Sequence, residues 1–225
     1  MHNFFLSFFL FLSITTTVTA SPADLKRKVL DVLPSLEGWC SSQKAENLID
    51  LVLEVRPNLC VEIGVFGGAS LFPVASALKF LQNGVAIGID PWDKFEAIRA
   101  FDPVEEATDL NWWGNLNFQY IYYSYVNMIA RNRLENYIIT LKTTSEHAAQ
   151  EIIDPIDILF VDGNHNSLIT LRDVELYLPK VRIGGYVWLN NLLDPRKHAA
   201  RDLILKSCEE IKSIDQGSCV LYKKK

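Results

Sequence analysis

Apolar runs alternate with amphipathic stretches along most of this chain. Short, predominantly apolar runs predict strands at 59–63, 85–89, 137–141, 156–161 and 186–189. Helical spacing of the apolar residues predicts helices at 23–33, 45–54, 69–81, 173–178 and 196–211. Residues 183–185 are predicted to form a turn, and 211–214 and 219–222 to form a hairpin around Gln216 and Gly217.

Strands that are apolar on both faces and alternate with helices indicate a parallel sheet covered on both sides. The sequence therefore predicts an α/β fold: a Rossmann-like, doubly wound, mostly parallel seven-stranded sheet with a C-terminal antiparallel hairpin. We expect residues 21–225 to form a single domain, since a chain of 225 residues is long enough to bury one substantial core. Ligands bind such sheets at the carboxyl ends of the strands, so the residues after each strand are the candidates for chemistry.

Residues 1–20 differ in character from the rest of the chain. An apolar run at 4–14 is too short to span a bilayer comfortably, and the small residues of Val18-Thr19-Ala20 follow it at the spacing of a signal-peptidase site. We therefore predict a signal peptide and an exported protein, although His2 stands where a Lys or Arg is usual. A retained membrane anchor and an intracellular protein are the alternatives that the sequence leaves open.

Composition excludes two classes of protein. Hydrophobic residues make up 49% of the chain, which argues against disorder, and the formal net charge of -5 gives no electrostatic case for binding nucleic acid. The four cysteines allow three full pairings in an oxidising compartment, and the sequence does not choose among them. Cys60 and Cys219 fall within predicted strands, so we expect buried thiols there.

A glycine turn follows the first predicted strand. Glu62 and Gly64 open it, Gly68 and Ser70 lead into a helix, and the next strand ends at Asp90. Glycines let the backbone approach a ligand, and a carboxylate in that place accepts hydrogen bonds from ribose hydroxyls. These features predict a mononucleotide-binding half. The alternatives are that the glycines only make a turn and that Asp90 only caps a helix.

A nicotinamide-binding site is the rival interpretation of the same turn. It requires Gly-x-Gly-x-x-Gly, so that the backbone can approach a pyrophosphate. In this chain Gly64 is followed by Phe66, Gly67 and Gly68, so the middle glycine is missing. The pattern favours a nucleotide-type ligand that carries no pyrophosphate.

Two further motifs follow later strands, Phe160-Val161-Asp162-Gly163-Asn164-His165 and Gly184-Gly185-Tyr186-Val187-Trp188-Leu189-Asn190-Asn191. Together with the glycine turn and Gly88-Ile89-Asp90, they make residues 45–222 resemble the class I S-adenosylmethionine-dependent methyltransferases. The similarity is strongest to the small-molecule O-methyltransferase branch that includes the catechol and macrocin O-methyltransferases. The resemblance implies S-adenosyl-L-methionine as cofactor, bound by Glu62, Gly64, Gly68, Ser70, Asp90 and Ser145.

Metal-dependent members of that branch hold a divalent ion with an Asp after strand four and an Asp-Asn or Asp-Asp pair after strand five. The resemblance places these ligands, for an ion such as Mg²⁺, on Asp162, Asn190 and Asn191. One expected carboxylate is therefore an amide, which is a weaker, neutral ligand for magnesium or calcium. The sequence leaves open whether a metal binds here.

The resemblance also implies that Asp162 and His165 are the catalytic residues. His165 lies near the position where catechol-type enzymes have a basic side chain, and an imidazole accepts a proton from a hydroxyl at neutral pH. The alternative is that His165 only bonds to a neighbouring loop.

We therefore predict an enzyme that methylates a hydroxyl of a small molecule. The long segment 95–136 contains Trp112, Trp113 and several tyrosines, which either line the acceptor pocket or, more often in proteins, serve packing.

Two alternatives remain: a non-catalytic S-adenosylmethionine-binding domain with a degraded metal site, and a nicotinamide-dependent oxidoreductase. Export argues against catalysis, because the cofactor is made inside cells. Expected partners are the hydroxylated acceptor, a membrane only through an uncleaved N-terminus, and a second copy in a homodimer.

Overall fold

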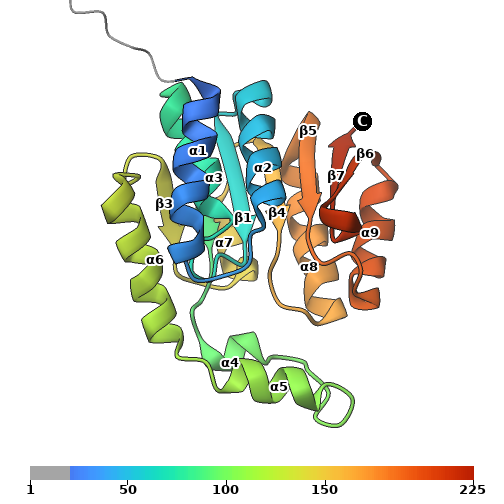
Figure 1. Cartoon of the computed structure of the whole chain (residues 1–225). Coiled ribbons are helices and arrows are strands. Elements are labelled where there is room, and N and C mark those ends of the chain that lie inside the picture. The colour runs from blue at the N-terminus through green and yellow to red at the C-terminus, as the bar shows by residue number, and fades with distance from the viewer. Residues whose placement is uncertain (1–20) are drawn as a thin grey trace, which may run out of the picture.

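The computed structural model describes residues 21–225, which form a seven-stranded sheet with helices on both faces (Figure 1). The sheet order is β3-β2-β1-β4-β5-β7-β6. Its strands are β1 (Leu59–Ile63), β2 (Val85–Ile89), β3 (Ile138–Leu141), β4 (Ile156–Val161), β5 (Val181–Leu189), β6 (Cys208–Ile214) and β7 (Cys219–Lys224). Strands β1 to β5 pair in parallel, and β7 pairs antiparallel with β5 and β6. The predicted fold class is confirmed. The predicted signal peptide lies outside the described residues.

Helices precede and connect the strands. They are α1 (Pro22–Val32), α2 (Ser42–Val55), α3 (Leu71–Leu81), α4 (Lys94–Ala97), α5 (Ala107–Gly114), α6 (Phe118–Asn132), α7 (Ser145–Glu151), α8 (Ser167–Tyr177) and α9 (His198–Leu205). Helices α1, α2, α3 and α6 contribute to one hydrophobic layer and α7, α8 and α9 to the other. Between β2 and α6 the chain leaves the sheet as an arm that carries α4 and α5 below the carboxyl ends of the strands (Figure 1).

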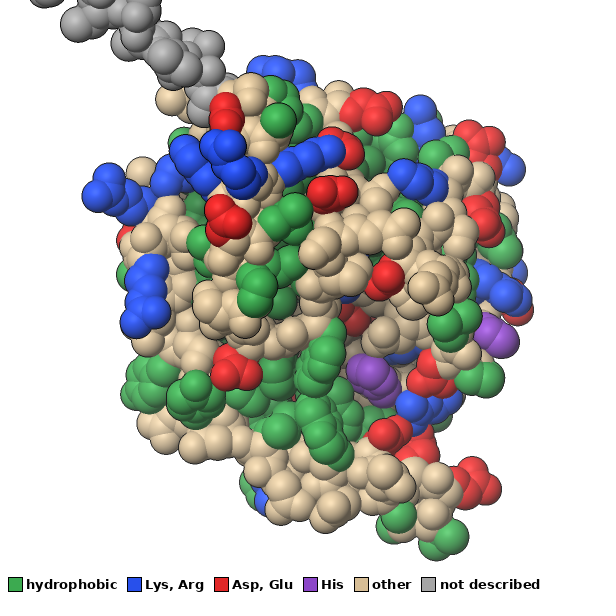
Figure 2. All heavy atoms as spheres, viewed as in Figure 1, with side chains coloured by type: hydrophobic (Ala, Val, Ile, Leu, Met, Phe, Trp, Pro, Cys, Tyr) green, Lys and Arg blue, Asp and Glu red, His purple; other side chains and the backbone are tan. Residues whose placement is uncertain are grey.

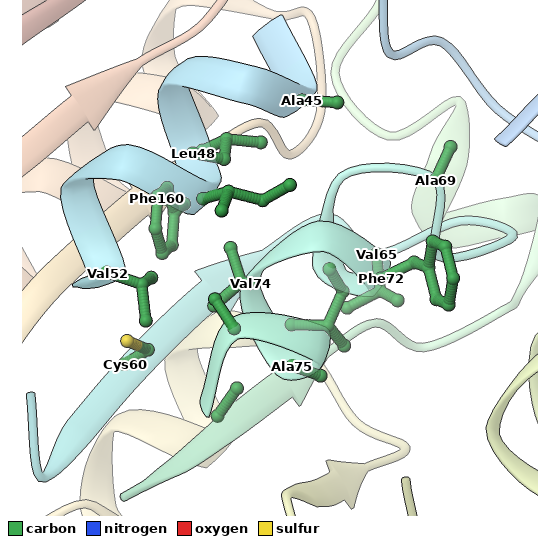
Figure 3. Close-up of a cluster of buried hydrophobic side chains, with 14 of the residues drawn as sticks. Ala45, Leu48, Val52, Cys60, Val65, Ala69, Phe72, Val74, Ala75 and Phe160 are labelled. Carbon is green, nitrogen blue, oxygen red and sulfur yellow. The ribbon is translucent and has the colours of Figure 1, made fainter. Parts of the chain in front are cut away.

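The two hydrophobic layers follow from the alternation of side chains along each strand. In β1, Cys60 packs against the α2–α3 side while Val61 packs against the other side, and in β4 Phe160 and Leu159 divide in the same way. Figure 3 shows the α2–α3 layer, where Leu48 lies beside Phe160. Strands buried on both faces are what the near-continuous apolar runs in the sequence predict.

Two predicted elements are wrong. Residues 183–185 do not form a turn but lie inside β5, where the pairing with β4 shifts register next to Ile158. Gly184, with φ of +75°, allows this irregularity. The predicted helix at 196–211 ends at Leu205, and its last residues belong to β6. The hairpin of β6 and β7 therefore begins earlier than the sequence pattern indicates, because pairing with β7 outweighs the helical spacing.

The predicted helix at 173–178 is longer toward its N-terminus and begins at Ser167. Its cap explains the start: the Asn166 carboxamide oxygen accepts hydrogen bonds from the amides of Leu168 (2.9 Å) and Ile169 (3.4 Å). This cap fixes the end of the loop that follows β4. The position of that loop matters below, because it contains His165.

The cysteines within the described residues are free thiols, and the predicted burial of Cys60 and Cys219 is confirmed. Among residues 21–225, none of the helices combines the length and apolar character needed to cross a membrane. Neighbouring strands β1 and β4 continue in opposite directions, β1 toward β2 and β4 toward β5. A crevice opens where connections diverge in this way, and ligands bind such sheets there.

Candidate functional site

A cleft opens at the carboxyl ends of β1, β2 and β4. The empty space of this main cleft is about 740 Å³, part of which is open to solvent. It is lined by five of the predicted site residues, Gly64, Asp90, Ser145, Asp162 and His165. A second hollow, the side pocket, shares Gly64, Asp162 and His165 with it and extends to Ser70, Asn191 and Lys44. Most residues predicted from the sequence are therefore brought together.

Gly64 sits where β1 and β4 come closest. Its φ is +85°, and a Cβ on it would lie 2.2 Å from the carbonyl oxygen of Asp162. The Gly64 amide donates to the carbonyl of Ile89 (2.9 Å), and the Asp162 amide donates to that of Ile63 (2.9 Å). Only glycine fits this conformation and this contact. The interpretation of Gly64 as a mere turn residue is too weak, because its backbone forms part of the cleft wall.

Gly68 has a different role from the one predicted. Its φ is +89°, and a Cβ there would meet Met128 Cε at 2.5 Å and Tyr125 at 3.0 Å. Gly68 therefore allows α6 to pack on the turn, and it is not among the residues that line the main cleft or the side pocket.

Phe66 occupies the place where a dinucleotide site has its middle glycine, and it adopts a glycine-like conformation with φ of +52°. This region is unfavourable for a bulky side chain. Two hydrogen bonds hold it: the Phe66 amide donates to Asp90 Oδ2 (2.9 Å), and Trp92 Nε1 donates to the Phe66 carbonyl (2.7 Å). The phenyl ring of Phe66 packs against the aromatic residues described below.

Asp90 ends β2 inside the main cleft. Its other oxygen, Oδ1, accepts from the amide of Trp92 (2.7 Å). Burial raises the pKa of Asp90, while the amides of Phe66 and Trp92 oppose that shift. Asp90 is not a helix cap, since Asp93 caps α4 by accepting from Phe95 and Glu96. Each Asp90 oxygen keeps a lone pair for a ligand.

Glu62 lies at the end of β1 with only 1% of its surface exposed. Its Oε1 accepts a hydrogen bond from the Ser70 hydroxyl, whereas Oε2 has no partner. Burial raises the pKa of Glu62 to about 8, and the Ser70 hydrogen bond opposes the rise. A buried acceptor without a partner is costly, and such groups often mark functional sites. Glu62 is suited to receive a cationic donor.

Ser145 begins α7, at the far side of the main cleft. Its hydroxyl donates to Asp173 Oδ1, and Tyr177 in turn donates to the Ser145 carbonyl (2.8 Å). Burial raises the pKa of Asp173 to about 7, although the Ser145 hydrogen bond opposes this. Sequence reasoning missed Asp173. The only signal in the sequence was an acidic residue, Asp173, among the apolar positions of its helix. Its role cannot be inferred from that helix alone, because its partner Ser145 is 28 residues away.

Asp162 follows β4 and faces both hollows. Its Oδ2 lies 3.5 Å from the ammonium of Lys44, and its Oδ1 accepts from Asn191 Nδ2 at 3.5 Å. Lys44, from the first turn of α2, is 5% exposed. Burial is the largest effect on the pKa of Lys44 and lowers it, but Asp162 together with Cys219, Cys40 and Glu62 raises it above its ordinary value, so the side chain stays protonated. Sequence reasoning missed Lys44, because nothing in the pattern of α2 distinguishes it from a solvated lysine.

Of the three predicted metal ligands, Asn191 lies against Asp162, whereas Asn190 turns its oxygen into the core. The Asn190 carboxamide oxygen accepts from Trp188 Nε1 (3.0 Å) and Cys219 Sγ (2.9 Å), so it is used inside the core. The carboxylate of Asp162 already faces a lysine. Across residues 21–225, no group of three or more His, Cys, Asp or Glu side chains is arranged to hold a metal ion. The donor set at this position does not fit a divalent cation.

His165 lies between the main cleft and the side pocket, with its ring centroid 5.4 Å from that of Trp113. Burial lowers the pKa of His165, and the nearby charge of Lys197 lowers it further. Lys197 is itself buried, donating to Thr170 Oγ1 (2.8 Å) and to the Asn164 carbonyl (3.0 Å). The imidazole is therefore neutral near pH 7 and able to accept a proton.

Indole rings form one wall of the side pocket, and the ring of Phe66, which lines the main cleft, packs against them. Trp39 contacts Phe66 (5.2 Å between centroids) and Trp112 (5.4 Å), and Trp112 contacts Trp113 (4.6 Å). Figure 2 shows hydrophobic side chains gathered beside a histidine, next to the arm that carries α4 and α5. We call Trp39, Phe66, Trp112 and Trp113 the aromatic wall.

The residues of the aromatic segment divide between a pocket wall and the interior. Trp112 and Trp113 line the side pocket, whereas Tyr122 and Tyr125 pack on Trp92 in the interior. Trp39, before α2, was not predicted, because it is far from this segment in sequence.

Ion pairs hold the arm in place. Arg196, after β5, contacts Glu106 (2.8 Å) and Asp109 (2.6 Å) at the start of α5. Asp194 also pairs with Arg196 (2.7 Å). Helix α5 is thus tied to the loop between β5 and α9, which keeps the aromatic wall over the side pocket.

Comparisons with known proteins agree with this geometry. A family model described as a methyltransferase domain matches residues 61–192. The O-methyltransferase from Bacillus cereus, solved with SAH, is 16% identical, with 93% of this chain and 94% of that chain covered and a TM-score of 0.59. O-methyltransferase TomG from Streptomyces achromogenes, involved in tomaymycin synthesis and solved with SAM, is 13% identical, with 93% of each covered and a TM-score of 0.61.

The O-methyltransferase NovP is 20% identical, with 82% of this chain and 80% of that chain covered and a TM-score of 0.63. None of the curated proteins compared with the chain is significantly similar to it. At these identities the solved structures establish the shared fold, and the family model carries the family assignment.

The raised pKa of Glu62 predicts a specific pH dependence of stability. Between its ordinary value of 4.5 and about 8 the folded protein keeps a proton that the unfolded chain loses, so this group's contribution to stability falls as pH rises through that window. Glu62→Gln, which cannot ionise, should therefore gain unfolding free energy relative to wild type between about pH 5 and about pH 8. Urea unfolding at several pH values measures this, with exposed Glu135→Gln as control. Parallel curves for wild type and Glu62→Gln would contradict a buried, protonated Glu62.

Proposed function

The chain belongs to the methyltransferase-domain family, and on that basis we propose that it is an S-adenosylmethionine-dependent enzyme that methylates a hydroxyl of a small molecule. The observation that carries the proposal is the unpartnered Glu62 Oε2, which is buried two residues before Gly64, and Gly64 lines the main cleft together with Asp90. Solved relatives with the same fold, the B. cereus enzyme and TomG, carry SAH and SAM.

The residues of the main cleft suit the parts of this cofactor. The α-ammonium of its methionyl end is a cationic donor of the kind that buried Glu62 lacks, and the Gly64 backbone allows close approach. Asp90 has lone pairs for the ribose hydroxyls. Ser145 stands at the opposite side, where the adenine would lie. The missing middle glycine at Phe66 suits a ligand without a pyrophosphate.

The cofactor supplies an activated methyl group on a sulfonium, so that attack by oxygen forms the O–C bond while the C–S electron pair passes to sulfur. The protein has to orient the acceptor and take its proton. Neutral His165 borders both hollows and is the base that we assign. The side pocket is the acceptor site, and its aromatic wall favours a flat molecule over a flexible chain.

We also propose that residues 1–20 direct export and are removed after Ala20. Ser21, the residue that follows this segment, caps α1 by a reciprocal pair of hydrogen bonds with Asp24. N-terminal sequencing of protein recovered from a secreting host should give Ser21 as the first residue. An Ala20→Lys variant should stay uncleaved, because a long charged side chain does not fit a small-residue cleavage site. Recovery of intact wild-type chain from the cytoplasm would refute the signal.

Cofactor binding is the first test of the proposed function. Calorimetric titration with S-adenosylmethionine should give one binding site, and Asp90→Asn should weaken binding by about 10- to 100-fold through loss of charge-assisted hydrogen bonds. Exposed Asp154→Asn serves as the matched control, and urea unfolding checks that both variants fold. Absence of any heat change with folded wild-type protein would remove both the catalytic proposal and that of a non-catalytic binding domain.

The role of His165 has a kinetic signature. His165→Ala should lower kcat/KM for methyl transfer by about 100-fold or more while the affinity for the cofactor is retained. Because burial lowers the His165 pKa, wild-type kcat/KM should rise with pH only in the acidic range below the ordinary value of 6.5 and be flat at neutral pH. Exposed His198→Ala is the control. Unchanged activity in His165→Ala would take this residue out of the mechanism.

A further inference from the structure

The proposed function assigns no role to one buried charge, the ammonium of Lys44. It lies on the side-pocket surface with Asp162, Asn191 and His165, and it comes from α2, far from the other three in sequence. Its Nζ is 3.5 Å from Asp162 Oδ2, and its side chain is 7% exposed. Burying a lysine is costly unless it is paired, and Lys44 is both paired with Asp162 and placed on the surface of a pocket.

Lys44 lies beside Asp162. Asp162 is the first of the three positions at which metal-dependent relatives are expected to hold a divalent ion. Here Asn190 uses its oxygen within the core, and Asn191 turns its amide nitrogen, a donor, toward Asp162 Oδ1. Asp162 thus faces a donor on one oxygen and an ammonium on the other. A divalent cation here would find a single carboxylate, whose oxygens already contact Asn191 and Lys44. The positive charge of Lys44 would also repel it.

We propose that Lys44 is the fixed cation of the acceptor pocket and replaces the divalent metal in this enzyme. This inference rests on the proposed function and deepens it. The ammonium donates a hydrogen bond to the oxygen of the acceptor hydroxyl and stabilises the negative charge that develops on it. Asp162, held by Asn191, keeps Lys44 in place and protonated.

The proton and electron balance of the step is complete with residues at the site. The acceptor O–H gives its proton to the neutral imidazole of His165, and the oxygen pair forms the bond to the methyl carbon. The C–S bond breaks with its pair on sulfur, which turns the sulfonium into a neutral thioether. His165 then releases the proton to solvent. Lys44 exchanges no proton and acts only as a donor of hydrogen bonds.

A lysine cation selects acceptors differently from a metal. A divalent ion chelates two neighbouring oxygens, whereas an ammonium needs only one acceptor oxygen in place. The aromatic wall beside Lys44 adds a preference for flat acceptors. We therefore expect a simple phenol, whose single hydroxyl ionises readily, to be methylated about as well as a vicinal aromatic diol.

The test uses the full mature chain and begins with wild type alone. Methyl transfer from S-adenosylmethionine to a panel of phenols and vicinal diols is measured with EDTA and with added Mg²⁺, and Mn²⁺ binding is followed by electron paramagnetic resonance. The proposal requires equal activity with and without chelator and no Mn²⁺ signal that depends on Asp162. Activity abolished by EDTA and restored by Mg²⁺, or Mn²⁺ binding that Asp162→Asn removes, overturns it.

Variants of Lys44 then separate its role from packing. Lys44→Met should lower kcat/KM by about 10- to 100-fold, the loss of one charged hydrogen bond, with cofactor affinity unchanged. Lys44→Arg should recover part of that loss, which a packing defect would not do. Lys44→Gln replaces Lys44→Met if that variant fails to fold, and exposed Lys28→Met is the matched control. Full activity in Lys44→Met, or a loss confined to cofactor affinity, overturns the proposal.

Failure of the two proposals can be told apart. If wild type binds no S-adenosylmethionine, the proposed function fails, and the Mn²⁺ measurement still decides whether this position takes a metal. If wild type binds the cofactor and transfers methyl groups but needs a divalent ion, only the inference on Lys44 fails.

Discussion

The close contact between the ends of β1 and β4 is the constraint on which the rest of the site depends. A Cβ at Gly64 would lie 2.2 Å from the Asp162 carbonyl oxygen, so only a glycine lets these two strands end side by side. That contact sets Glu62, from one strand, and Asp162, from the other, at the same crevice. The parallel pairing of Ile63 with Val161 brings the two strand ends together, and Gly64 lets the chain turn there without a clash.

Several ionisable side chains of this molecule are buried. Glu62, Asp90 and Asp173 all have raised pKa values because the cleft removes them from water, and Lys44 and Lys197 lie equally deep. Each such group costs stability unless it is paired. The fold keeps five of them in or next to the main cleft and the side pocket at a cost to stability, which is common where a site has to meet a charged ligand.

Sequence patterns predicted the central strands closely, because β1, β2 and β4 are buried on both faces and their apolar runs have a single explanation. They failed at β5 and α9, where Gly184 and the helical spacing before Cys208 point to a turn and a longer helix. Residues next to the glycine turn were found by their motifs. Lys44, Asp173 and Trp39 were not, because each acquires its role only from partners that the fold brings from distant parts of the chain.

The main cleft and the side pocket are formed by different parts of the chain. The cleft is shaped by backbone at strand ends, which many sequences can produce, and relatives of 13–20% identity share the fold. The roof of the side pocket is an arm outside the sheet, fastened by Arg196 and faced with the indole of Trp112. Exchanging side chains on that arm leaves every strand untouched. The shape and polarity of the side pocket can therefore change without any change in the sheet.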